Sequence, residues 1–218
     1  MSFTLSDYTA LRPYVYHLTA RANLSGIKAS RTLHSAAALA DRAARPELIR
    51  SRRHTHEVLS AGEAPVVLRD QAPLHARNMT LDDGWSLDDF VEALRARVFF
   101  WPGSAGGPIA HGRRHYGRYA SERPVIIRAE CTALLASNSS NTPLACKYNS
   151  GSPRWSNGIA SPRGAATFVS CEEATFRAGE AVEVTFEGAV HLPATAEYGD
   201  VPMGPWNRLQ ATRQRSNS

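Results

Sequence analysis

The chain has 218 residues with a formal net charge of +5, and 43% of them are hydrophobic and 21% charged. Such a chain is long enough for one domain with its own core, and no apolar run approaches the roughly 20 residues that a transmembrane helix needs. Its three cysteines, Cys131, Cys146 and Cys171, lie far apart, which argues against a disulfide framework or a zinc site and favours buried thiols in a cytoplasmic protein.

Arginine dominates the basic residues, because all but two of the 25 (Lys28 and Lys147) are arginine. The planar guanidinium group offers a fork of donors that suits phosphate, so this composition favours an anionic partner such as a nucleotide or a nucleic acid. Arginine-rich, lysine-poor chains are also common where coding DNA is rich in G and C. The charge balance alone therefore leaves the partner open.

The first third of the chain predicts a strand followed by helices. Residues 14–18 alternate β-prone side chains and predict a strand. A helix is expected to open at residues 23–27 with Asn23 as its N-cap, and the alanine-rich run 36–44 favours another helix. A short strand is predicted over residues 65–68.

Strands predominate after one further helix. Residues 85–94 carry apolar side chains at helical spacing and predict an amphipathic helix that starts near Ser86. A buried strand over 98–101 is expected to stop at Pro102-Gly103, and the glycine-rich loop after it lacks both a P-loop lysine and the spacing of a dinucleotide-binding turn. The remaining predicted strands cover residues 124–129, 167–169 and 181–186.

The order of these elements predicts an α+β fold with a mainly antiparallel or mixed sheet, and not a doubly wound parallel sheet. We expect one domain over residues 1–198. Residues 199–218 are polar and are expected to form a poorly ordered C-terminal tail.

Four features carry candidate chemistry, and the first is the phrase YHLT at residues 16–19, with Asn23 and Leu24 shortly after it. A histidine that leaves a strand beside a helix N-terminus can hold a ribose hydroxyl or a carboxamide, and the helix N-terminus favours phosphate. Thr19 and Asn23 add short polar groups. The alternative is that His17 is a structural histidine whose hydrogen bonds are satisfied within the fold.

The second feature is the basic run at residues 49–53, which contains Arg50, Arg52 and Arg53. Two of its guanidinium groups could clamp a pyrophosphate with paired hydrogen bonds, or the run could be an ordinary solvated face. The sequence does not distinguish these arginines from one another or from Arg69.

The third feature is Glu183, which lies between Val182 and Val184 in a predicted strand. An unpaired buried carboxylate is costly, so Glu183 should meet a basic group or face a cleft. Strand alternation places both valines on one face and Glu183 on the other. The alternative is an exposed polar face of a one-sided sheet.

The fourth feature is a loop over residues 149–164 in which Ser-Pro-Arg occurs twice, ending at Arg154 and at Arg163. These arginines suit phosphate contacts, and Trp155 between them could stack on a base, unless the loop only packs against the domain. The run 113–119 also interleaves cations with aromatic rings. No cluster of metal ligands is expected.

Taken in this order, the motifs resemble those of the DarT-type ADP-ribosyltransferases over roughly residues 14–195. The matching phrases are YHLT at 16–19, Asn23-Leu24 at a helix start, Ile49 with Arg52 and Arg53, VFFWP at 98–102, PVII at 124–127 and VEVTF at 182–186. The whole chain also resembles an uncharacterised bacterial family with the phrases LRDQxPL, VFFWPG and NSGSPR.

The first resemblance implies an ADP-ribosyltransferase-like split sheet with N-terminal helices, and NAD as a substrate. The residues implied for cofactor binding are His17, Thr19, Asn23, Leu24 and Arg52, and those implied for catalysis are Glu183 and Arg53. Cleavage of the bond between ribose and nicotinamide builds positive charge on the sugar, which a fixed carboxylate stabilises.

The same resemblance implies single-stranded DNA or RNA as the acceptor, although a protein acceptor stays open, as does an antitoxin partner. The residues implied for acceptor binding are Arg154, Trp155, Arg163 and Phe168, the last of which lies in the segment 167–181 before the glutamate. Three other interpretations stay open: an RNA 2′-phosphotransferase-like enzyme, a non-catalytic arginine-rich domain that binds nucleic acid, and a structural protein in which Glu183 only pairs with an arginine.

Overall fold

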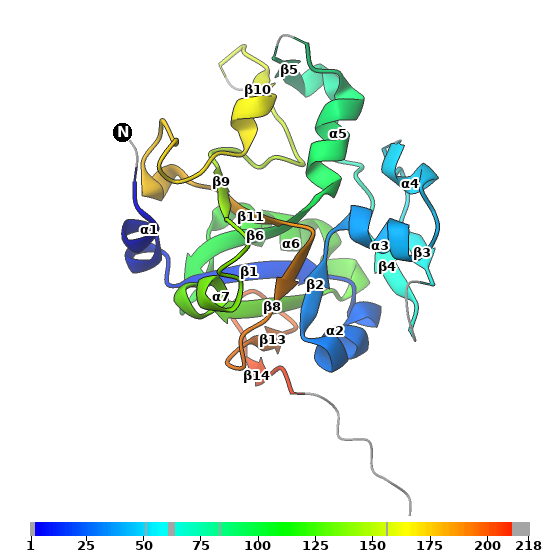
Figure 1. Ribbon diagram of the computed structural model, residues 1–218, viewed down its shortest axis with the longest axis vertical. Helices are drawn as coiled ribbons and strands as arrows, with labels where there is room; N and C mark the ends of the chain where they lie inside the picture. Colours follow the sequence, from blue (N-terminus) through cyan, green and yellow to red (C-terminus); the bar gives the residue numbers. More distant parts are fainter. Residues whose placement is uncertain (1–2, 51, 61–63, 83, 156, 211–218) are drawn as a thin grey trace, which may run out of the picture.

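The computed structural model describes residues 3–50, 52–60, 64–82, 84–155 and 157–210 (Figure 1). At its centre lies a sheet whose neighbouring strands run antiparallel. In spatial order its strands are β14 (Asn207–Arg208), β13 (Glu197–Gly199), β8 (Val125–Glu130), β1 (Tyr14–Thr19), β6 (Arg97–Ser104), β11 (Glu183–Glu187) and β9 (Leu144–Cys146), with β7 (Gly107–Pro108) beside β6.

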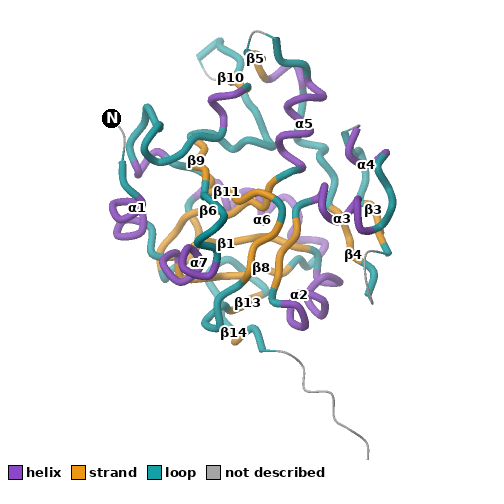
Figure 2. The backbone as a smooth tube through the Cα atoms, in the orientation of Figure 1, coloured by secondary structure: helices purple, strands orange, loops and turns teal. Residues whose placement is uncertain are grey.

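Three two-stranded ladders lie around this sheet, and Figure 2 shows them as short orange segments. Two of them are antiparallel: β2 (Thr32–His34) with β12 (Ala189–His191), and β3 (Glu57–Leu59) with β4 (Val66–Leu68). The third is parallel and joins β5 (Met79–Leu81) to β10 (Ser161–Arg163).

Helices cover both faces of the central sheet. The bounds are α1 (Leu5–Leu11), α2 (Leu24–Ser30), α3 (Ala36–Arg42), α4 (Glu47–Arg50), α5 (Leu87–Arg95), α6 (Ala110–Tyr119) and α7 (Cys131–Ser137), with 3-10 turns at 21–23, 76–78, 120–122, 165–167 and 178–180. Tyr8 of α1 and Leu134 of α7 join the core on the face that carries Val15, whereas Tyr119 of α6 packs with Tyr16. Because neighbouring residues of a strand point to opposite faces, α6 lies across the sheet from α1 and α7.

Helix starts follow local rules where the sequence offers a capping residue. Ser86 caps α5, accepting a hydrogen bond from the Asp89 N–H, while the Asp89 carboxylate accepts from the Ser86 N–H. The same helix buries Phe90, Val91 and Leu94, so the predicted amphipathic helix is confirmed with its start near Ser86.

The sheet opens between β1 and β6. Their pairing ends at Tyr16 and Trp101, and beyond that point Val184 of β11 pairs with the next residue of β6, Phe100. The rest of β1, His17–Thr19, keeps its pairing with β8 only. The two strands therefore separate at the end of β1, which positions the site described below.

The predicted end of the strand at Pro102-Gly103 is wrong, because β6 continues to Ser104. Proline lacks only its N–H, and the Pro102 carbonyl accepts a hydrogen bond from Ile109 at 2.9 Å. Glycine is needed next, since a Cβ at Gly103 would lie 2.3 Å from the Gly107 carbonyl oxygen. Pro102 and Gly103 are therefore explained by the close approach of β7, and not by the end of the strand.

Two other predicted elements differ from the structure. Residues 165–167 form a 3-10 turn, and only Val169 makes a bridge, to Ala145, so no strand covers 167–169. Residues 199–210 belong to the fold, because β14 pairs with β13 and Leu209 is 1% exposed. Residues 211–218 of the predicted tail lie outside the described residues.

The observed arrangement is the α+β class predicted from the element order, with an antiparallel central sheet. Within the described part of the chain, no helix combines the length and the apolar character that crossing a bilayer requires.

Candidate active site

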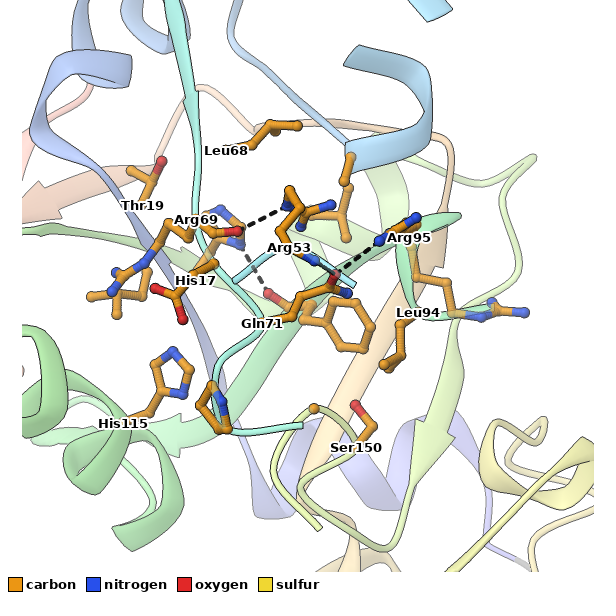
Figure 3. A pocket seen from close by; sticks show the side chains of 18 of the residues that line it. His17, Thr19, Arg53, Leu68, Arg69, Gln71, Leu94, Arg95, His115 and Ser150 are labelled. Carbon is orange, nitrogen blue, oxygen red and sulfur yellow. Dashed lines mark hydrogen bonds between the residues drawn. The ribbon is translucent and has the colours of Figure 1, made fainter. Parts of the chain in front are cut away.

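A cavity of about 280 Å³ opens where β1 and β6 separate, and Figure 3 shows it from close by. Its walls come from the end of β1, the segment after β4, the junction of α5 with β6, the helix α6, the turn at 149–151 and the start of β11. His17, Arg53 and Glu183 therefore line one cavity although they are far apart in the sequence.

His17 is a half-buried, neutral ring in this cavity. Its Nδ1 lies 2.9 Å from the carbonyl oxygen of Phe99, and because a carbonyl only accepts, Nδ1 carries the proton. Burial lowers the pKa of His17 to about 4, so the ring is uncharged at neutral pH. Its Nε2 is then left as a hydrogen-bond acceptor in a ring of fixed orientation.

Asn23 joins β1 to β4 and does not cap α2. Its Nδ2 donates to Thr19 Oγ1 at 3.0 Å and to the Val67 carbonyl at 2.9 Å, and the Val67 N–H donates to Oδ1 at 2.8 Å. Asn23 occupies the predicted N-cap position of α2, but its backbone is helical and its side chain makes no capping hydrogen bond. Asn23 and Thr19 line the cavity, yet these bonds commit the amide to holding the strand that leads to Arg69.

Among the candidate arginines, Arg53 and Arg69 line the cavity. Arg53 Nε donates to the Arg69 carbonyl at 3.1 Å, while its Nη1 is buried without a hydrogen-bond partner among the described residues. The three guanidinium nitrogens of Arg69 are buried and likewise make no hydrogen bond there. Arg69 lies 3.5 Å from the centre of the Tyr119 ring, and its Nη2 is 3.6 Å from Glu122 Oε2.

Burial lowers the pKa of both Arg53 and Arg69, because their charges are removed from water with incomplete compensation. Buried guanidinium donors of this kind favour an anion that can accept their free N–H groups. Arg52 donates to the Ala72 carbonyl at 3.4 Å and does not line the cavity. The side chain of Arg50 lies outside the described residues.

Sequence reasoning missed two more arginines in the wall, Arg95 and Arg97. Arg95 is 1% exposed, its Nη2 donates to Gln71 Oε1 at 3.1 Å, and burial is the main cause that lowers its pKa to about 10 (Figure 3). Arg97 lies 4.9 Å from the centre of the Phe168 ring. The available signal was spacing, because Arg95 follows Val91 by four residues on the apolar face of α5.

Glu183 enters the cavity from the start of β11 and is 4% exposed. Its Oε2 accepts two hydrogen bonds from Ser150, from the backbone N–H at 3.1 Å and from the hydroxyl at 2.5 Å. Burial raises the pKa of Glu183 to about 7, although the Ser150 bonds and the Arg163 charge act in the opposite direction. The neighbouring Val184 belongs to the core, so Glu183 faces the cleft as predicted.

Arg163 holds the turn that binds Glu183. It is 2% exposed, and its guanidinium donates to the Asn149 carbonyl at 2.8 Å, the Ser150 carbonyl at 3.3 Å and the Ser161 hydroxyl at 2.6 Å. The prediction that Arg163 contacts the acceptor is corrected on this ground, since its donors serve the protein backbone. Sequence reasoning also missed Ser150, because nothing near it in the chain indicates a carboxylate partner.

His115 of α6 closes the side of the cavity next to His17 (Figure 3). Its ring packs against Trp101 and Tyr119, with ring centres 4.7 and 5.2 Å apart. Burial, followed by the charges of nearby arginines, lowers the pKa of His115 to about 3, so this ring is also neutral. It lies in the run 113–119 that the sequence showed to interleave cations with aromatic rings, but it was not predicted to line a cavity.

The other predicted site residues lie outside this cavity. Leu24 packs against the core at the start of α2, and Phe168 is 9% exposed with its ring edge against Phe99. Both are explained by packing and not by ligand contact. Trp155 is 56% exposed, its indole N–H donates to the Arg77 carbonyl, and Arg154 lines a neighbouring basic pocket.

A second cavity, of about 500 Å³, adjoins the first between α2, β2 and the start of β4. The two cavities share five lining residues: His17, Thr19, Asn23, His34 and Leu39. Ligand pockets usually enclose about 300–1,000 Å³. The two cavities therefore adjoin at these shared residues and together offer more room than either alone.

Comparison with known proteins identifies a family without indicating a reaction. Neither the curated proteins nor the solved structures include a match to this chain. The sequence model of one family, described as a family of unknown function (DUF7002), matches residues 13–196, a range that contains both His17 and Glu183. By this match over most of its length, the chain belongs to the DUF7002 family.

Proposed function

We propose that this chain is an NAD-dependent ADP-ribosyltransferase with a site of the DarT type on an ADP-ribosyltransferase-like sheet. The observation that carries the proposal is the convergence of His17, Arg53 and Glu183 on one cavity at the point where the sheet opens. Their chemical types match the three parts of NAD that the site must hold: a nucleoside, a pyrophosphate and the reacting sugar carbon.

The pyrophosphate of NAD fits the wall formed by Arg53 and Arg69. Both carry buried guanidinium donors that the described residues leave without acceptors, and phosphate oxygens would satisfy them. The acceptor Nε2 of His17 suits a ribose hydroxyl or the carboxamide of the nicotinamide. The adjoining 500 Å³ cavity provides room for the rest of the dinucleotide.

Glu183 is the proposed catalytic carboxylate. The bond between the ribose C1′ and the nicotinamide nitrogen breaks, and its electron pair leaves with nicotinamide while positive charge develops on the sugar. The ionised carboxylate stabilises that charge, the acceptor nucleophile forms a bond to C1′, and its proton passes to Glu183. With a pKa of about 7, Glu183 can hold this proton near neutral pH.

Incubation with NAD labelled in its adenylate part tests the proposal directly. The protein is mixed with single-stranded DNA, single-stranded RNA or cell lysate, and both label transfer and nicotinamide release are followed. We expect transfer by the wild type and by Glu172→Gln, an exposed carboxylate used as the matched control, and transfer slowed by about 10²–10⁴-fold in Glu183→Gln. Full activity of Glu183→Gln would remove the proposed mechanism.

A further inference from the structure

A third cavity, of about 310 Å³, lies beside the first and shares His115 and Asn149 with it. Basic side chains surround it, and no aspartate or glutamate occurs among the described residues that line it. Its five cationic residues are Arg114, Arg118, Lys147, Arg154 and Arg163. This concentration of positive charge beside the proposed reaction site favours the binding of an anionic ligand.

Two of the five cations are already engaged. Arg163 serves the carbonyls of the turn at 149–150, and Lys147 is 3.4 Å from Glu180. Arg114, Arg118 and Arg154 are exposed, and in the described part of the chain none of the three pairs with a carboxylate. Their donors are therefore available to a ligand.

The three available arginines approach the pocket from two elements. Arg114 and Arg118 are four residues apart on α6 and so share one face of that helix. Arg154 comes from the loop after β9. Burial, followed by the charges of Arg114 and Arg154, lowers the pKa of His111, which agrees with both guanidinium groups lying close to that ring.

We propose that this pocket binds a phosphate group of the acceptor, so that the second substrate is a nucleotide or a nucleic-acid strand that reaches Glu183 past Asn149 and His115. The substrate class rests on the proposed transferase function, whereas the phosphate site rests only on the pocket. Guanidinium groups bind phosphate with paired, charge-assisted hydrogen bonds, and three of them match its double charge better than that of a single carboxylate. A single Asp or Glu side chain would neutralise only one of the three cations.

Binding of labelled oligonucleotides tests the site without requiring activity. A short fluorescent single strand is titrated into wild-type protein, into the double variant Arg114→Gln/Arg118→Gln, and into Arg208→Gln, which removes an exposed arginine from β14 at the far end of the sheet (Figure 1). We expect the double variant to bind the strand at least tenfold more weakly. The slope of log K against the logarithm of the salt concentration should become shallower by about 1.4, because two positive charges are lost. Arg208→Gln should bind as the wild type does.

Competition with a mononucleotide and with inorganic phosphate separates the two sources of phosphate. Displacement of the strand by a mononucleotide at similar concentration assigns the pocket to a free nucleotide, and its failure assigns the pocket to a strand. Equal binding by the double variant, or an equal loss in Arg208→Gln, would overturn the site. NAD binding measured on the same variants should stay within twofold of the wild-type affinity. Absence of NAD binding in all of these proteins would contradict the transferase proposal, whereas unchanged strand binding by the double variant would contradict the phosphate site, so the two failures are distinguishable.

Discussion

The cavity that holds Glu183 and the basic pocket beside it share a wall, but their ionisable side chains differ in exposure and in charge. In the first, Glu183 and Arg95 are buried and His17 is half-buried, and all three are hydrogen-bonded and shifted in pKa toward their neutral forms. In the second, Arg114 and Arg118 are exposed cations. Burial fixes orientation and tunes proton affinity, whereas exposure retains charge for attracting a ligand from solution.

Glu183→Gln should produce the largest effect, because it removes the only proposed proton acceptor from the buried cavity. We expect the rate of nicotinamide release to fall by about 10²–10⁴-fold, with NAD affinity changed by less than threefold. The double variant Arg114→Gln/Arg118→Gln should instead raise the KM for the acceptor at nearly unchanged kcat. A similar loss of kcat in both variants would contradict the separate roles assigned to the cavity and to the basic pocket.

The stability of the protein should depend on pH through Glu183. Its pKa is raised from 4.5 to about 7 in the fold, so its contribution to stability is fully present below pH 4.5 and is lost as the pH rises through 7. Relative to wild type, Glu183→Gln should therefore gain about 3 kcal/mol of unfolding free energy between pH 4 and pH 8. Urea unfolding at both pH values measures this difference, and a pH-independent difference would contradict a buried, raised carboxyl.

Arg53→Ala should weaken NAD binding by about 10–100-fold, because a charged hydrogen-bond donor in a buried site contributes about 1.5–3 kcal/mol. Arg52→Ala is the matched control, since Arg52 lies one residue away but does not line the cavity. Calorimetric titration of NAD into the two variants gives both affinities. An equal loss in Arg52→Ala would indicate that the basic run acts only through its overall charge.

Ser150→Ala should produce the smallest effect, a shift in the pH dependence of the reaction. The wild-type rate is expected to rise with pH and level off above pH 7, since both roles of Glu183 need its ionised form. The Ser150 hydroxyl bond stabilises that form, so its removal should move the midpoint to higher pH by about one unit or less. Pre-steady-state rates between pH 5 and 9 would detect the shift, and a lower midpoint would contradict the assignment.

The sequence predicted well wherever local pattern decides structure. Ser86 and the spacing of the following apolar residues located α5, and strand alternation placed Glu183 away from the core side chain Val184. It failed where distant contacts decide. Pro102 lies inside a strand because β7 returns beside it, and the C-terminal residues join the fold because Trp206 packs on Tyr16.

The candidate site divides in the same way. Residue type and order pointed to His17, Arg53 and Glu183, which do share a cavity. The sequence could not show that Ser150 binds Glu183 or that Arg163 supports Ser150, because these contacts join loops and strands far apart in the chain. The sequence also could not show which of Arg52 and Arg53 lines the cavity, because two adjacent arginines differ only in the direction in which the folded backbone points their side chains.

The most direct test of the central claim is calorimetric titration of NAD into the wild-type protein and into Glu183→Gln under identical conditions. If the cavity between His17 and Glu183 is a dinucleotide site, both proteins bind one NAD per chain with similar affinity, and Glu183→Gln releases nicotinamide about 10²–10⁴-fold more slowly than the wild type. Absence of NAD binding to the folded wild type, or nicotinamide release by both proteins at equal rates, would contradict this account.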